Sequence, residues 1–373
     1  MSSNVARAEV VQAPSPTRQV FRVLDLFAGA GGLTQGFREA DSRYESVRAV
    51  EMDTSAAASY AHTFGDVVYA GKIEDWLREE DVPEVDVVVG GPPCQGFSNL
   101  GKRDAEDARN LLWRHYVETV ARARPKYFVL ENVPQFMKSP QFHLFRQATS
   151  PGERLAEYDF TANVLNAADY GTPQTRKRAI VIGRHRDLPP IGPPPPTHVG
   201  RHVTVGAALQ NVAREVTTTD LPDVRTEFRG VELPGAFKSS DLHVTRNYTK
   251  LSLERFRMIP PGGNRFDIDD ALLSPCWRKH KTGSADVMGR LYLNKPSVTI
   301  RTEFFKPEKG RYLHPTEHRA ITHYEAALLQ GFGPEHQWVG SKISIARQIG
   351  NAVPIPLGRA IAKHLATVLE ASR

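Results

Sequence analysis

Cysteine is scarce in this sequence, with only Cys94 and Cys276 among 373 residues. Two cysteines are too few for a disulfide framework or a four-ligand zinc site. We therefore expect no metal site, and each cysteine is either an inert core residue or a working thiol.

Long apolar runs are also missing. None approaches the roughly 18 residues that span a bilayer, and the mean hydropathy is −0.40. Residues 1–7 carry no apolar stretch behind their first charge, so no secretory signal is predicted. With 40% hydrophobic and 24% charged residues, the chain has enough apolar material for a packed core. We expect a soluble, cytoplasmic protein without a membrane partner.

The positive charge is concentrated in one part of the chain. The net charge is +6, and residues 201–320 hold 20 basic and 14 acidic residues, whereas the remainder holds 28 of each. A basic run, Arg176-Lys177-Arg178, precedes this window. The excess indicates either a solvated surface or a second domain that binds a polyanion, and composition alone leaves both open.

Apolar, β-rich runs alternate with helical patterns from residue 20 onward. Strands are predicted at 20–27, 47–51, 85–89, 126–130, 160–165 and 179–182, and helices at 33–39, 54–62, 111–123 and 141–148. Short buried strands separated by helices predict an α/β fold, with a doubly wound, mostly parallel, Rossmann-like sheet.

Six prolines in residues 189–196 interrupt this alternation. We predict a flexible arm at 1–19, a catalytic domain at 20–188, and a linker with a smaller, irregular, β-rich domain at 189–339. Within the latter, 290–293 and 297–302 have β-like patterns. The segment 340–373 is expected to return to the first domain through an amphipathic helix at 355–369.

A glycine-rich loop, LDLFAGAGGL at 24–33, follows the first predicted strand and opens the first helix. Glycines allow backbone N–H groups to approach a ligand, and a helix N-terminus favours anionic groups. Glu51 closes the next strand, where an acid can accept two ribose hydroxyls. The pattern indicates an adenosine-cofactor site, although it does not separate NAD from S-adenosylmethionine, and a tight turn without a ligand is the plain alternative.

Two further segments lie at the same predicted sheet edge. Cys94, in GGPPCQGFS, follows a strand on a loop stiffened by prolines, a setting typical of a nucleophile, although a lone cysteine is more often inert core. Glu131, in ENVP, ends the next strand, where an acid in an apolar loop can keep a proton to donate. A helix cap or a surface acid is the alternative for Glu131.

Basic and amide residues occur in two later motifs. In QTRKR, at 174–178, arginine can bond a base oxygen or phosphate through its forked donors. Asn351, in QIGNAVP, could be a plain helix cap.

Together the ordered motifs FAGAGGL, VEMD, GGPPCQGFS, ENV, QTRKR and QIGNAVP resemble the bacterial DNA (cytosine-5) methyltransferase family, and residues 319–332 are similar to its penultimate motif. The resemblance covers nearly everything from residue 20 onward except the variable middle region. It implies methyl transfer from S-adenosylmethionine to C5 of cytosine in a specific sequence of double-stranded DNA, leaving S-adenosylhomocysteine. It also implies a monomer in a restriction–modification setting, with a paired endonuclease as a candidate partner.

By this resemblance Cys94 adds to C6 of a flipped cytosine, Glu131 holds N3 and supplies a proton, and Arg178 contacts O2. The residues expected to contact DNA are Gln95, Ser98, Arg176 and Arg178. The residues expected to line the cofactor pocket are Phe27 at the adenine, Glu51 at the ribose, and Gly29, Gly31, Gly32, Leu33, Met52, Ile73, Pro93, Asn351 and Val353. Lys72 and Tyr324 depart from the family pattern, which usually has an acid and an arginine there.

Three other functions would use parts of the same sequence. A nicotinamide-dependent oxidoreductase would use the glycine loop but would not need Cys94 or QTRKR. A DNA-binding protein without catalysis would not need to keep both Cys94 and Glu131. RNA methylation uses the same chemistry, but the family's tRNA-modifying branch usually has threonine where Ser98 stands. Candidate base readers are Arg246, Arg278, Lys279 and His280, although most such residues contact phosphate.

Overall fold

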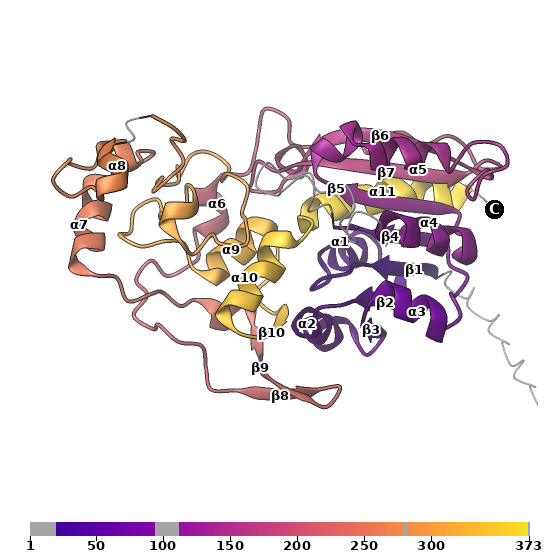
Figure 1. The fold of residues 1–373 in the computed structure, drawn as a ribbon, viewed down its shortest axis with the longest axis horizontal. Coiled ribbons are helices and arrows are strands. Elements are labelled where there is room, and N and C mark those ends of the chain that lie inside the picture. The colour runs from indigo at the N-terminus through magenta and orange to yellow at the C-terminus, as the bar shows by residue number, and fades with distance from the viewer. Residues whose placement is uncertain (1–19, 94–111, 280–281, 372–373) are drawn as a thin grey trace, which may run out of the picture.

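The computed structural model describes residues 20–93, 112–279 and 282–371, so the predicted arm lies outside it. Within these ranges, a large sheet carries helices on both faces, and a second body lies beside it (Figure 1). The large sheet has seven strands in the order β3-β2-β1-β4-β5-β7-β6. Its strands are β1 Phe21–Leu26, β2 Tyr44–Glu51, β3 Val68–Ala70, β4 Val87–Gly90, β5 Tyr127–Asn132, β6 Tyr158–Asn166 and β7 Lys177–His185.

The pairing of the strands confirms the predicted α/β class. The pairs from β3 to β5 are parallel, and only β7 runs against its neighbours β5 and β6 in the described sheet. The sequence prediction missed β3 and helix α3 (Ile73–Glu79), because three and seven residues are too few to show a period. The strand order reverses between β1 and β4, and ligands bind at such a switch point in open α/β sheets.

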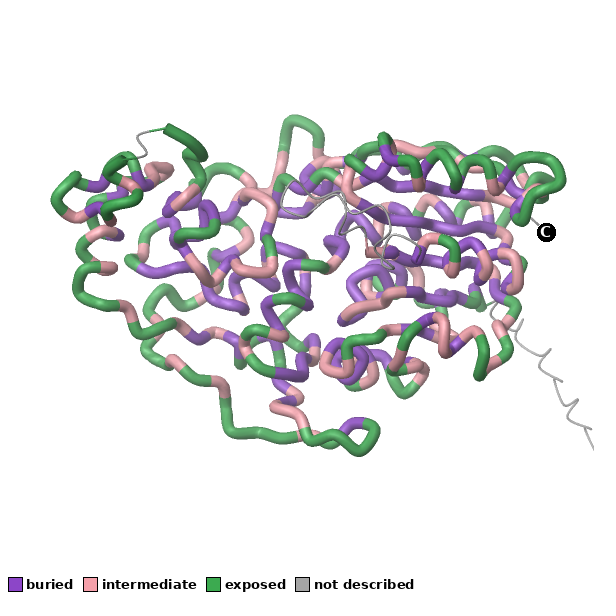
Figure 2. Tube along the Cα trace, viewed as in Figure 1, coloured by how far each residue is buried: buried purple, intermediate pink, exposed green. Residues whose placement is uncertain are grey.

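Alternate residues of the strands face two separate apolar cores. On one face, β-strand residues such as Val23 and Val129 pack against α1 (Gly32–Ala40) and α11 (Ile355–Ala371). On the other face, neighbours such as Leu24 and Phe128 pack against α3, α4 (Leu112–Ala123) and α5 (Pro140–Gln147). The central strands are accordingly buried along their length (Figure 2).

Helix α11 lies directly against α1, although more than 300 residues separate them in the chain. A Cβ atom added at Gly36 of α1 would lie 2.7 Å from the backbone nitrogen of Arg359 and 2.9 Å from the carbonyl carbon of Gly358. The two helix backbones therefore approach as closely as glycine allows, and this contact brings the C-terminal segment to the glycine loop.

We expect Gly36→Ala to destabilise the fold by about 1–3 kcal/mol in denaturant unfolding, because the methyl group meets backbone atoms that cannot move aside. In an unpacked helix the same change would stabilise by about 1 kcal/mol. Gly192→Ala is the matched control, since nothing lies within 4 Å of its added Cβ. Equal stability of the two variants would contradict a tight α1–α11 contact.

The second body contains a small antiparallel sheet in the order β10-β9-β8 and several helices. Its elements are α6 Val205–Leu209, β8 Arg225–Phe228, β9 Val231–Lys238, α7 Lys250–Met258, α8 Pro275–Lys279, α9 His323–Gln330, β10 Gln337–Val339 and α10 Lys342–Asn351. The sequence did not predict these strands. The β-like segments 290–293 and 297–302 make only isolated bridges, Arg290 with Leu313 and Ser297 with Gln174.

Short 3-10 turns connect the described elements, at Pro134–Lys138, Ala167–Tyr170, Ser239–Leu242, Arg265–Asp267 and Pro307–Lys309. Helices α6, α9 and α10 share one apolar core, and α7 belongs to a smaller core at the far end of the molecule, near α8 (Figure 1). Thus α10 packs within the second body, and the chain returns to the large sheet with α11. No helix in the described ranges is both long and apolar enough to cross a membrane.

The second body is fastened to α2 (Thr54–Phe64) of the sheet body. Ser59 of α2 donates to the Gln348 side chain (2.7 Å) and accepts from the Val339 backbone (2.7 Å). Phe228 from the β8–β9 hairpin packs into the same apolar cluster as Tyr60. Polar and apolar contacts therefore hold the two bodies in one arrangement.

Candidate active site

The predicted site segments leave the sheet side by side. In the strand register, Leu26 pairs with Val50 and with Gly90, and Gly90 pairs with Leu130. The residues one position further along the four strands are Phe27, Glu51, Gly91 and Glu131. The structure thus brings the glycine loop, the acid of the second strand, the proline loop and the acid of ENVP to one edge at the switch point.

Glu51 holds the glycine loop through its carboxyl group. Its Oε2 accepts from the Gly29 N–H and its Oε1 from the Asp53 N–H, both at 2.8 Å. Burial raises the pKa of Glu51, and these backbone bonds act in the opposite direction. Each carboxylate oxygen can accept a second bond, so Glu51 can bind ribose hydroxyls while it holds the loop.

The glycines of the loop serve different purposes. Gly29 has φ 55°, and nothing lies within 4 Å of a Cβ added there, so its α-carbon faces open space. A Cβ at Gly31 would lie 2.1 Å from the Phe64 ring, and one at Gly32 would lie 2.7 Å from the Val353 carbonyl oxygen. Gly29 thus leaves room for a ligand, whereas Gly31 and Gly32 permit close packing.

Phe27 and Met52 are apolar residues that follow the ends of β1 and β2. Phe27 adopts a left-handed conformation with φ 56°, which is strained for a bulky residue and is often found at binding sites. Met52 is 62% exposed although it is apolar. An open glycine, an acid with spare acceptors and two apolar side chains suit a nucleoside, so the residues present fit the predicted cofactor.

The other predicted cofactor residues have mixed locations. Leu33 and Ile73 are buried in the two sheet cores. Pro93 is half-buried, and Asn351 is exposed at the end of α10. Lys72 lies at the N-cap of α3 and makes no side-chain capping bond. These assignments stay predictions.

The second predicted centre is a buried corner formed by β5, β7 and the proline loop. Arg178 Nε lies 2.7 Å from Glu131 Oε1, and both side chains are nearly buried. A Cβ added at Gly91 would lie 2.9 Å from Glu131 Oε2, so only glycine leaves space for this carboxylate. Asn132 Nδ2 donates to the Pro92 carbonyl oxygen (3.0 Å) and fixes the loop to β5.

This geometry refines the prediction for Glu131. The sequence suggested an acid in an apolar loop, whereas the structure places the Arg178 guanidinium beside its carboxyl group. Cys94, Gln95 and Ser98 follow Pro93 directly but lie outside the described residues, as does His280.

Arg176 lies in a place that does not suit the predicted DNA contact. It is 2% exposed, and its terminal nitrogens donate to the carbonyl oxygens of Ile300 (2.8 Å) and Gly350 (2.9 Å). The side chain therefore points into the molecule and links the start of β7 to the second body. In this arrangement Arg176 holds the second body, and a contact with phosphate would break both bonds, so its contact with DNA stays a prediction.

Asp25 is a buried acid beneath the glycine loop that the sequence analysis did not single out. Its carboxylate is 1% exposed and accepts from Thr34 Oγ1 (2.6 Å), which lies 3.0 Å from the Tyr60 hydroxyl. Burial raises the pKa of Asp25 to about 7, the Thr34 bond opposes the shift, and Glu51 adds to it. The sequence feature that could have identified Asp25 is an acidic residue inside the apolar run VLDLF.

We expect Asp25 to make the fold less stable as pH rises. The native state keeps the proton up to about pH 7, whereas the unfolded chain loses it near 3.8, so stability is lost between these values. Between pH 5 and 8 the wild type should lose about 2–3 kcal/mol relative to Asp25→Asn, which mimics the protonated acid. Denaturant unfolding at both pH values measures this, with exposed Asp81→Asn as the control. Parallel pH profiles for wild type and Asp25→Asn would contradict it.

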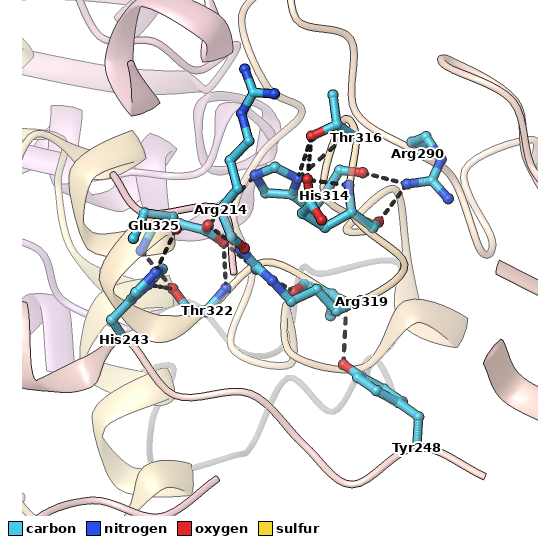
Figure 3. Close-up of polar contacts among 12 residues, drawn as sticks. Arg214, His243, Tyr248, Arg290, His314, Thr316, Arg319, Thr322 and Glu325 are labelled. Carbon is cyan, nitrogen blue, oxygen red and sulfur yellow. Dashed lines mark hydrogen bonds and ion pairs between the residues drawn. The ribbon is translucent and has the colours of Figure 1, made fainter. Parts of the chain in front are cut away.

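The block similar to the penultimate motif forms a buried polar cluster in the second body (Figure 3). Arg319 donates through both terminal nitrogens to the Glu325 carboxylate, at 2.8 and 2.7 Å, and Glu325 also accepts from the Thr322 N–H. Burial alone would raise the pKa of Glu325, but Arg319 holds it below its ordinary value. The cluster is therefore structural.

Several of the basic residues that contribute to the positive charge of the 201–320 window are buried. Four arginines of the 201–320 window are at most 8% exposed, and they mainly donate to backbone carbonyls or to Glu325: Arg265, Arg290, Arg311 and Arg319. The charge available to a polyanion is thus smaller than the sequence count suggests. In the described ranges, no group of three or more His, Cys, Asp or Glu side chains is arranged to hold a metal ion.

Comparisons with known proteins identify the family of the chain. The model of the C-5 cytosine-specific DNA methylase family matches residues 21–367. The chain is 33% identical over 349 residues to the Type II methyltransferase M1.HphI of Haemophilus parahaemolyticus, covering 91% of this chain and 85% of the relative. It is 32% identical over 378 residues to M.XorII of Xanthomonas oryzae, covering 93% and 84%.

A similar solved structure is an E. coli protein described as a DNA modification methyltransferase encoded within a prophage. It shows a TM-score of 0.71 at 25% identity and covers 94% of this chain and 99% of its own. The Dnmt2 methyltransferase of S. pombe, at 16% identity and a TM-score of 0.58, shares the fold. The chain therefore belongs to the C-5 cytosine-specific DNA methylase family and is a DNA cytosine-5 methyltransferase.

Proposed function

We propose that the protein transfers the methyl group of S-adenosylmethionine to C5 of a cytosine flipped out of duplex DNA, with Cys94 as the nucleophile. One observation carries the proposal. The Glu131–Arg178 pair lies against Gly91, in the loop that leads to Cys94, and this loop leaves the sheet beside the glycine loop held by Glu51. The residues proposed to bind the base and those proposed to bind the cofactor thus lie at one edge of the sheet.

In the proposal each residue of the corner has its own role in the reaction of the base. The Cys94 thiolate forms a bond to C6, and the displaced electron pair makes C5 nucleophilic. Glu131 binds N3 and delivers a proton there, while Arg178 donates to O2. Arg178 and Glu131 pair with each other in the described arrangement, so binding of the base exchanges this ion pair for contacts with O2 and N3.

Bound S-adenosylmethionine supplies an electrophilic methyl group on sulfur, and Glu51 and the Gly29 loop would hold its ribose and methionine ends. After C5 has taken the methyl group, a base removes the C5 proton. The electron pair of that bond restores the double bond to C6, and the Cys94 thiolate leaves. N3 returns its proton to Glu131 and the C5 proton passes from the base to solvent, so the enzyme ends with the charges that it had before the cycle.

The target cytosine has to be flipped out of the duplex, because a thiol cannot reach C6 of a stacked base. Flipping costs a few kcal/mol in lost stacking and pairing. The second body is fastened to α2 of the sheet body. In the proposal it offers the surface that faces the sheet body across the duplex. We further propose that the enzyme acts as a cytoplasmic monomer paired with a restriction endonuclease.

Labelled methyl transfer to mixed-sequence duplex DNA, followed by base analysis, tests the proposal. We expect the label as 5-methylcytosine, with a rate about 10²–10⁴-fold lower for Glu131→Gln, which cannot deliver the proton. Glu118→Gln, at an exposed ion pair with Arg154, is the matched control and should keep full rate. Label in tRNA but not in DNA, or no transfer despite cofactor binding, would contradict the proposal.

A further inference from the structure

Four aromatic rings pack together beneath the glycine loop. We call this group the aromatic box, and its members are Phe64, Phe332, His336 and Trp338. The ring of His336 lies at the centre of this box. Its centroid is 4.6 Å from that of Phe332, 4.7 Å from Trp338 and 6.0 Å from Phe64. Phe64 belongs to α2, whereas the other three come from the segment between α9 and β10 and from β10 itself.

The glycine loop stands directly on this aromatic box. The Phe64 ring fills the place where Gly31 would carry a side chain. Ala30 is 3% exposed and belongs to the same apolar core as Phe332 and Trp338. The loop proposed to hold the methyl donor therefore packs against residues that come much later in the chain, Phe332 and Trp338 among them.

His336 is the one polar member of the box that lacks a partner among the described residues. It is 6% exposed, and neither ring nitrogen makes a hydrogen bond there. The Trp338 indole, by contrast, donates to Ser239 Oγ at 2.8 Å. A phenylalanine would fill the same space without burying two polar atoms, so the imidazole needs an explanation beyond packing.

The chemistry of the ring points toward the loop. Burial lowers the pKa of His336 to about 3, so the imidazole is neutral and carries one N–H donor. The backbone of Ala30 opposes that shift, as a carbonyl acceptor facing the ring does. Ala30 shares a buried core with Phe332 and Trp338, whose rings pack on the His336 ring, so the loop backbone at Ala30 lies beside this unpaired donor.

We propose that His336 is a positioning residue for the glycine loop: its ring N–H binds the Ala30 carbonyl and holds the loop in the form that binds the cofactor. The inference rests on the proposed function of this loop. It assigns to the second body a direct part in cofactor binding, because the donor that steadies the loop lies between α9 and β10.

Binding of S-adenosylhomocysteine to the full chain, measured by titration calorimetry, tests this role without turnover. We expect His336→Phe to weaken binding about three- to tenfold, the effect of one lost hydrogen bond, while its melting temperature stays equal or rises. His336→Asn and His336→Gln place an amide donor near one or the other ring nitrogen. One of them should restore affinity.

His323→Phe is the matched control. His323 is also buried, but its Nε2 is satisfied by the Lys342 carbonyl (2.9 Å), and it lies outside the aromatic box. Equal binding by wild type and His336→Phe, or an equal loss in His323→Phe, would overturn the role of His336 alone. Absence of binding by the wild type would instead overturn the proposed cofactor site. If His336→Phe does not fold, equal affinities of the Asn and Gln variants overturn the proposal, and unequal affinities support it.

Discussion

Replacing Cys94 by alanine should abolish methyl transfer while leaving cofactor affinity nearly unchanged. The thiolate makes the bond that activates C5, so without it the rate should fall by at least about a thousandfold. In the proposal the cofactor is held by the glycine loop, which follows β1, and by Glu51 at the end of β2, and these two are bonded to each other. Single-turnover transfer of labelled methyl and calorimetric cofactor binding would measure the two effects separately.

The second cysteine offers a matched control. Cys276 is exposed on α8, in the part of the second body farthest from the sheet (Figure 1). Cys276→Ala should therefore turn over like the wild type. Substantial turnover by Cys94→Ala, or equal losses in both variants, would exclude Cys94 as the nucleophile.

Glu325→Ala should cost about 3–5 kcal/mol of folding stability, because it leaves the Arg319 guanidinium buried without its carboxylate. Glu325 is 1% exposed and also accepts the Thr322 N–H at the start of α9, so the helix loses its cap as well. Denaturant unfolding of the full chain, monitored by circular dichroism, would measure the loss.

Two comparisons separate the buried charge from the lost contacts. The double variant Arg319→Met with Glu325→Leu removes both charges and should recover much of the stability. Glu118→Ala, which breaks the exposed pair with Arg154, should cost less than about 1 kcal/mol. A loss in Glu325→Ala no greater than that in Glu118→Ala would show that the cluster in Figure 3 contributes little.

Much of the site was predictable because it follows the strands. Phe27, Glu51 and Glu131 each come directly after or at the end of an apolar run, and parallel strands place such residues at one edge. The family motifs marked the same positions. Sequence could not show that Arg178 lies 2.7 Å from Glu131, since this depends on β7 running against β5.

The second body was much harder to predict. Its strand β9 contains Pro234 and Gly235, which weaken a strand pattern, and its partner β10 lies about a hundred residues later. Arg176 and Arg290 show a further limit. A charge count treats every arginine as a surface group, whereas these two are 2% exposed and serve backbone carbonyls. Pairing at long range and burial of charge are both tertiary effects.

The contact of α1 with α11 also bears on how the enzyme is made. Helix α1 can acquire its partner only after α11 has left the ribosome, so during translation the glycine face of α1 and one face of the sheet stay uncovered. Closing a loop of this length is slow and leaves apolar surface open to aggregation. A nascent chain that stops short of α11 should consequently accumulate as chaperone-bound or degraded material, and active methyltransferase should appear only with full-length synthesis.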